Sequence, residues 1–108
     1  MNFVDLYSLM LHRLVAEKML VDEENVLQIA RKNLNRWLSS ESFVGSERFA
    51  LLEWQVILEN SNSEEIRKII TQDTDEGQRL RSSSPFAGVL DKATRDKVWS
   101  ECAEIRPA

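Results

Sequence analysis

Apolar residues recur every three or four positions along most of this chain, and that spacing limits what it can fold into. Between residues 2 and 20 they form one stripe, plotted at 100° per residue, made of Phe3, Leu6, Tyr7, Met10 and Leu14. Only 3 glycines and 2 prolines interrupt the 108 residues. The alternating runs of β-branched residues that mark strands are missing. The sequence therefore predicts an all-α fold.

Residues that commonly cap helices divide this pattern into segments. The helices that we expect are 2–20, a second after Asp22 to about Leu38, 47–60 after Ser46, a short one after Ser63, a turn through about Arg81, and a last one from Asp91 to about Ile105. Pro85 lacks a backbone donor, so an irregular segment of about 82–90 precedes the last helix. We expect a single compact bundle of four to five helices over residues 1–108.

The segment 47–60 is apolar on two sides. One arc holds Ala50, Leu51, Trp54, Ile57 and Leu58, and the other holds Phe49, Leu52 and Val56. A helix with two apolar sides is typical of the middle of a bundle. We therefore expect it to lie between the first two helices and the C-terminal ones. The last helix is expected to bury Val98, Trp99, Cys102 and Ile105.

The charge balance disfavours non-specific binding to nucleic acid. The net charge is −4 and the pI about 5.0, whereas phosphate neutralisation favours basic proteins. If nucleic acid is bound, the candidate contact is the basic cluster Arg31, Lys32 and Arg36, although such a run more often is the solvated face of a helix.

Cysteine content and apolar stretches indicate a cytoplasmic protein that does not enter a membrane. Cys102 is the only cysteine, so no intrachain disulfide forms, which suits a reducing compartment. The N-terminus lacks the features of a signal peptide. The apolar stretches are shorter than the ~20 residues that span a bilayer.

No group of residues in the sequence predicts catalysis, a metal site or a cofactor. Asp5, Ser8 and His12 have the residue types of a nucleophile–base–acid set, but they project in parallel from one helix. We interpret them as a solvated polar face with a surface histidine. One histidine and one cysteine cannot build a zinc site alone, and the isolated glycines form no phosphate loop. The run 73–77 has its glycine at the wrong position for a calcium loop.

The segment 80–90, which reads LRSSSPFAGVL, is the main candidate for a binding site. It places a large aromatic residue outside any regular element, next to arginines and three serines. Such a residue fills either the protein's own core or a pocket on a partner, and both remain open here. For partner binding the predicted contacts are Arg79, Arg81, Ser82, Ser83, Ser84, Pro85 and Phe86.

Three strings of this sequence resemble a group of small bacterial proteins: ARKNLNRW at 30–37, LEW at 52–54 and LRSSSPFAGVL at 80–90. The resemblance covers most of residues 26 to 100, and its last string is the most specific. Some members of that group look like antitoxins, or like regulators with an added helix-turn-helix, paired with a toxin. The resemblance implies a binding or neutralising role, in which the chain covers the active surface of a toxin-like protein partner.

We therefore expect a non-enzymatic protein–protein interaction module of antitoxin-like character. The first alternative is a homodimeric structural or adaptor protein, in which Val4, Leu11 and Val15 widen the stripe of the first helix and contact a second copy. The second alternative is a regulator that contacts nucleic acid through its basic cluster.

Overall fold

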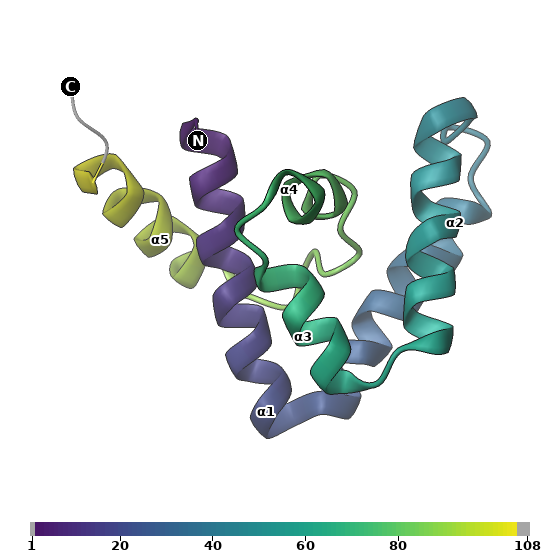
Figure 1. Ribbon diagram of the computed structural model, residues 1–108, viewed down its shortest axis with the longest axis horizontal. Coiled ribbons are helices and arrows are strands. Elements are labelled where there is room, and N and C mark those ends of the chain that lie inside the picture. Colours follow the sequence, from purple (N-terminus) through teal and green to yellow (C-terminus); the bar gives the residue numbers. More distant parts are fainter. Residues whose placement is uncertain (1, 106–108) are drawn as a thin grey trace.

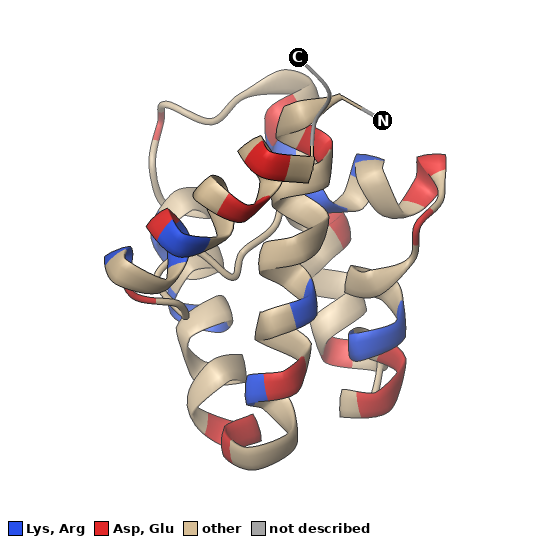
Figure 2. Cartoon of the chain, turned by 90° about the vertical axis from the view of Figure 1, so that its left-hand side faces the viewer, with Lys and Arg blue, Asp and Glu red and all other residues tan. Residues whose placement is uncertain are grey.

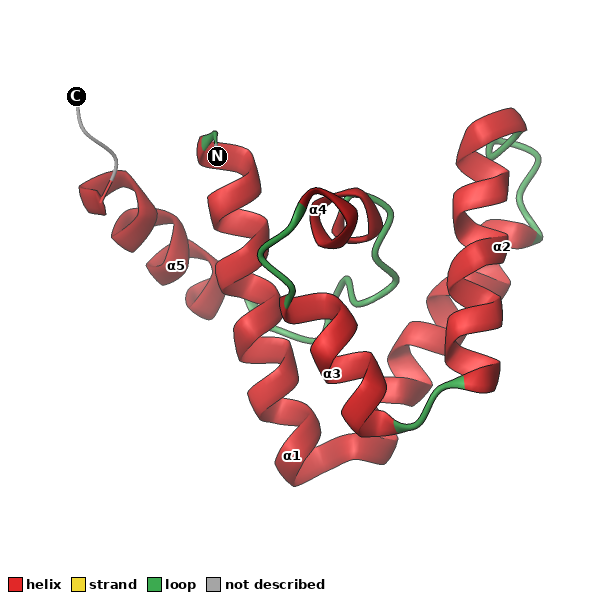
Figure 3. Cartoon of the chain, viewed as in Figure 1, coloured by secondary structure: helices red, strands yellow, loops and turns green. Residues whose placement is uncertain are grey.

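Five α-helices and no strand make up the part of the chain that the structure, a computed structural model, describes, which is residues 2–105 (Figures 1 and 3). The helices are α1 (Phe3–Leu38), α2 (Gly45–Asn60), α3 (Ser63–Thr71), α4 (Asp75–Arg81) and α5 (Lys92–Ile105). The predicted all-α, compact fold of four to five helices is confirmed. Within residues 2–105, no helix is both long enough and apolar enough to cross a membrane.

The first two predicted helices form one helix, α1, that bends at Asp22. This residue has φ −147° and ψ 50°, outside the helical region, while the residues on either side of it are helical. The break therefore falls at the predicted residue, but no loop separates the two arms of α1, residues 3–21 and 23–38. In Figure 1 the two arms diverge from the bend like the sides of a V. Both α3 and α4 pack against α1.

The central element is α1, and the prediction that the helix at 47–60 occupies the middle is wrong. Each of the other four helices packs against α1, whereas α2 lies at one edge (Figure 1). One apolar arc of α2 is buried through Leu51, Trp54 and Leu58. Of its second arc, Leu52 is half-buried, and Phe49 and Val56 are 73% and 57% exposed. Because α1 bends, its two arms and α3 fill the centre, and α2 packs at the edge.

Two of the predicted caps differ from those of the structure. The N-cap of α2 is Val44, which makes no side-chain cap bond, and Ser46 lies inside the first turn. The N-cap of α3 is Asn62 in a capping box, and Ser63 is the first helical residue. The predicted cap at Asp91 is confirmed, because its carboxylate accepts the backbone N–H three residues later at 2.8 Å.

The last helix buries only half of its predicted face. Val98 and Cys102 are buried, whereas Trp99 and Ile105 are 50% and 60% exposed. The Trp99 ring instead lies on the surface of α1, edge-on to Phe3 and Tyr7 at centroid distances of 4.4 and 5.1 Å.

Candidate functional site

The three strings that carry the resemblance meet in one place, and Asn33 makes the first connection. Asn33 is buried, and its side-chain amide donates to the carbonyl oxygens of Pro85 and Ala87, both at 2.8 Å. Arg36 donates to the side-chain oxygen Oδ1 of Asn33 at 2.9 Å, which orients the amide. Asn33 therefore holds the irregular segment against α1. Sequence reasoning missed it, although a polar residue with the apolar spacing of Ala30 and Leu34 was a usable signal.

Trp54 makes the second connection. Its indole Nε1 donates to the carbonyl oxygen of Leu80 at 2.9 Å, and its ring lies edge-on to Phe86 at 5.8 Å. Phe86 is only 4% exposed and also faces the His12 ring at 6.4 Å. Pro85 is fully buried as well. Of the two interpretations of this segment, packing into the chain's own core therefore holds for Pro85 and Phe86, which leaves neither open to a partner in this conformation.

Arg81 is also an interior residue. Its Nη1 donates to the carbonyl oxygens of Ile70 at 3.4 Å and Gln72 at 2.5 Å, at the end of α3. Its Nε and Nη2 are buried and make no hydrogen bond to residues 2–105. Burial lowers the pKa of this guanidinium. Arg81 thus stabilises the junction of α3 and α4, and its predicted contact with a partner does not fit this conformation.

Of the residues predicted for partner binding, Arg79 and the three serines remain accessible. The Arg79 guanidinium bonds both carboxylate oxygens of Glu53 at 2.8 Å and those of Glu76 at 2.6 and 2.9 Å. These bonds hold the pKa of both carboxyls below its usual value and raise that of Arg79. Ser82 is exposed, and Ser83 and Ser84 are partly exposed.

A groove with a volume of about 450 Å³ lies beside the three serines, and we call it the serine groove. It is lined by Trp37, Phe43, Glu47, Leu51, Ser82, Ser83 and Ser84. The rings of Trp37 and Phe43 lie 6.1 Å apart at 39° and form an aromatic wall. Sequence reasoning assigned no binding role to this wall, because residues 37 and 43 lie on either side of a loop.

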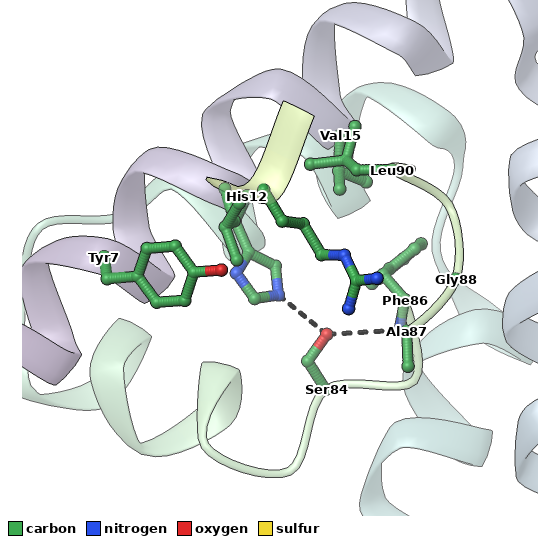
Figure 4. Close-up of a pocket in the computed structure, with 10 residues that line it drawn as sticks. Tyr7, His12, Val15, Ser84, Phe86, Ala87, Gly88 and Leu90 are labelled. Atoms are coloured by element: carbon green, nitrogen blue, oxygen red, sulfur yellow. Dashed lines mark hydrogen bonds between the residues drawn. The ribbon is translucent and has the colours of Figure 1, made fainter. Parts of the chain in front are cut away.

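Ser84 also borders a second pocket, where it contacts His12 (Figure 4). The His12 Nε2 and Ser84 Oγ atoms are 2.7 Å apart, and His12 Nδ1 lies 2.7 Å from the Ser8 carbonyl oxygen. A carbonyl oxygen only accepts, so Nδ1 carries the proton and Nε2 accepts from the serine hydroxyl. Ser84 Oγ in turn accepts the backbone N–H of Phe86 at 3.2 Å.

His12 is 8% exposed, so the prediction of a surface histidine is wrong. The irregular segment 82–90, far away in sequence, folds over this face of α1 and covers it. Burial lowers the pKa of His12; the bond to the Ser8 carbonyl raises it, and the charge of Arg81 lowers it further. The pocket, which we call the histidine pocket, has a volume of about 320 Å³. Its lining comprises Tyr7, Leu11, His12, Val15, Ser84, Phe86, Ala87, Gly88, Leu90 and Arg95.

The residues predicted for self-association do not form one exposed face. Val4 is exposed, Leu11 lines the histidine pocket, and Val15 is buried in the core. Contact with a second copy through Val4 stays a prediction.

The basic cluster Arg31, Lys32 and Arg36 is exposed on the second arm of α1. Basic and acidic residues are interspersed along the helices in Figure 2. Nucleic-acid contact through the cluster stays a prediction. Within residues 2–105, no three potential metal ligands of the His, Cys, Asp or Glu type gather.

The arrangement offers the serine groove and a hydroxyl–imidazole pair, and Ser84 lines both the groove and the histidine pocket. The three strings of the resemblance converge on it through Asn33, Trp54 and Phe86. In comparisons with known proteins, no family model, no curated protein and no solved structure matches this chain.

Proposed function

We propose that this chain is a protein–protein interaction module of the antitoxin type, and that the serine groove is its binding surface. In this role the groove binds a partner and carries out no reaction. The observation that carries the proposal is the aromatic wall of Trp37 and Phe43 beside three serines. Aromatic side chains contribute large contact areas at little entropic cost and are enriched at interfaces.

The chemistry of the serine groove points to a basic side chain on the partner. The hydroxyl protons of all three serines are donated within the chain, to two backbone carbonyls and to a histidine ring. The oxygens of Ser82 and Ser83 therefore face a partner mainly as acceptors, whereas that of Ser84 already accepts the N–H of Phe86. Glu47 lines the same groove and makes no ion pair with residues 2–105.

An arginine of the partner fits this set of groups. A guanidinium stacks on aromatic rings and donates to a carboxylate, and it is the cation most often found at interfaces. The net charge of −4 also favours a basic partner surface. The partner is therefore a protein that presents an arginine within an otherwise basic patch.

Charge reversal at Glu47 tests this proposal. The binding partner in the test is the protein encoded next to this chain in its genome, and its affinity is measured by calorimetry. Glu47→Arg should weaken the complex at least tenfold, about 1.4 kcal/mol, because it places like charges in contact. The wild-type affinity should fall as salt is added.

Glu59→Arg is the matched control, since Glu59 is an exposed glutamate of the same helix outside the serine groove. It should keep the wild-type affinity. Equal affinities for wild type and Glu47→Arg, or no binding by the neighbouring gene product, would contradict the proposal.

A further inference from the structure

We propose that Ser84 is an activated nucleophile, with His12 as its general base, and that it accepts the acyl group of a carboxylic ester bound in the histidine pocket. The histidine pocket shares only Ser84 with the lining of the serine groove. The activity does not use the set Asp5, Ser8 and His12 considered from the sequence.

The hydrogen bonds orient the pair for proton transfer. Nucleophilic serines need a base within about 2.6–3.2 Å and a third group that orients the base. The Ser84 Oγ to His12 Nε2 distance is 2.7 Å, and the Ser8 carbonyl oxygen holds Nδ1 at 2.7 Å. The tautomer with a free acceptor at Nε2 is thereby fixed. Ser8 is a positioning residue in this arrangement, through its backbone.

The surroundings keep the base ready. His12 is buried, which lowers its pKa, and the nearby Arg81 charge lowers it further against the raising effect of the Ser8 carbonyl. A neutral imidazole therefore predominates at neutral pH and can take a proton. Ser84 itself is partly exposed and reaches the pocket (Figure 4).

The histidine pocket has walls for a short apolar acyl group. Leu11, Val15 and Leu90 line it, and its volume of about 320 Å³ is small. Candidate donors for a developing oxyanion are among the residues that line it. Arg95 lines the pocket, and the backbone N–H groups of Ala87 and Gly88 make no hydrogen bond to other residues of 2–105.

The reaction needs no group beyond these residues and water. Ser84 Oγ attacks the ester carbonyl carbon while its proton moves to His12 Nε2. The bond from that carbon to the alcohol oxygen breaks, and the departing oxygen takes the proton from His12 and leaves as the alcohol. Water then repeats the sequence on the acyl-serine, which releases the carboxylic acid and restores the Ser84 hydroxyl.

Incubation of the full chain with p-nitrophenyl butyrate tests the proposal by intact mass and peptide mapping. A butyryl adduct is expected on Ser84 and should be absent in Ser84→Ala. His12→Gln can still accept the serine hydroxyl but cannot take its proton, so acylation should slow about 100-fold or more. Ser100→Ala is the control, because Ser100 is an exposed serine of α5 that lines neither pocket, and it should acylate like wild type.

The pH dependence of the wild-type rate keeps the test valid even if the His12 variant fails to fold. The rate should rise with pH and level off above a pKa lower than that of an ordinary histidine. Four results would overturn the proposal: no adduct on Ser84, equal labelling of Ser82, Ser83 and Ser84, an adduct on His12, or a rate that does not depend on His12. Ser84 would then be only a structural link between α1 and the segment 82–90.

Discussion

Asn33 is a single polar side chain in the interior that fixes the backbone of a distant segment. Its amide bonds two carbonyl oxygens, and the carbonyl of Pro85 lies within the buried part of the chain. A buried carbonyl that loses its donor keeps its desolvation cost without compensation. The polar group is therefore worth more at this position than an apolar residue of similar size.

Asn33→Ala should lower the free energy of unfolding by about 2–3 kcal/mol, because its three side-chain hydrogen bonds are lost and the carbonyl of the buried Pro85 is left unpaired. Urea denaturation of the purified variant measures this loss. Asn35→Ala, at an exposed position of the same helix, should stay within about 0.5 kcal/mol of wild type. Equal effects of the two substitutions would mean that Asn33 does not hold the segment.

The buried His12 makes stability depend on pH. Its folded-state pKa is lowered, chiefly by burial, below the unfolded value of about 6.5. The unfolded state therefore binds more protons in this range, and stability falls as pH falls from about 7 toward 5. Urea denaturation at several pH values should show this decline in wild type, and His12→Gln should remove it. The carboxyls bonded to Arg79 lose their contribution only at lower pH, because their folded pKa values are depressed.

At the level of single helices, the sequence predicted those features that depend on residues close to one another along the chain. The breaks at Asp22 and Asp91 follow from residues next to them in sequence, and the helical period follows from spacing. The place of α2 in the fold depends instead on how sharply α1 bends, which no neighbouring residue indicates. A second apolar side was interpreted as a buried side, and the structure leaves it exposed.

The two sides of α2 should respond differently to substitution. Trp54→Ala should cost about 3–5 kcal/mol of unfolding free energy, since Trp54 is fully buried and hydrogen-bonded. Phe49→Ser should change it by less than about 0.5 kcal/mol, because Phe49 is exposed. Chemical denaturation of both variants measures these changes. A large loss of unfolding free energy for Phe49→Ser would mean that this side of α2 is covered in solution.

For the whole molecule, the candidate site lies beyond what sequence spacing can indicate. His12 and Ser84 are separated by 72 positions, and no periodic pattern links them. The string LRSSSPFAGVL could be singled out by composition and resemblance, but which of its side chains face inward depends on Asn33 and Trp54. Arg81 and Phe86 were therefore candidates for partner contact, although the fold uses both internally.

The same segment links both arms of α1, which predicts how the molecule unfolds. Ser84 bonds His12 on the first arm, and the carbonyl of Val89 accepts from Lys18 of that arm at 2.9 Å. Pro85 is held by Asn33 on the second arm. Neither arm can unfold without releasing the segment that stabilises the other.

Thermal unfolding should therefore be one cooperative transition, despite the bend in α1. The measurement compares helix content by circular dichroism with tryptophan fluorescence, which reports Trp54 near the segment 82–90 and Trp99 on α5. A Trp99→Phe variant isolates the signals of the two remaining tryptophans, and its midpoint by fluorescence should equal that by circular dichroism. A shared segment that couples the arms must be released in the same step. Separate midpoints would therefore show that the arms unfold independently and that the segment 82–90 does not couple them.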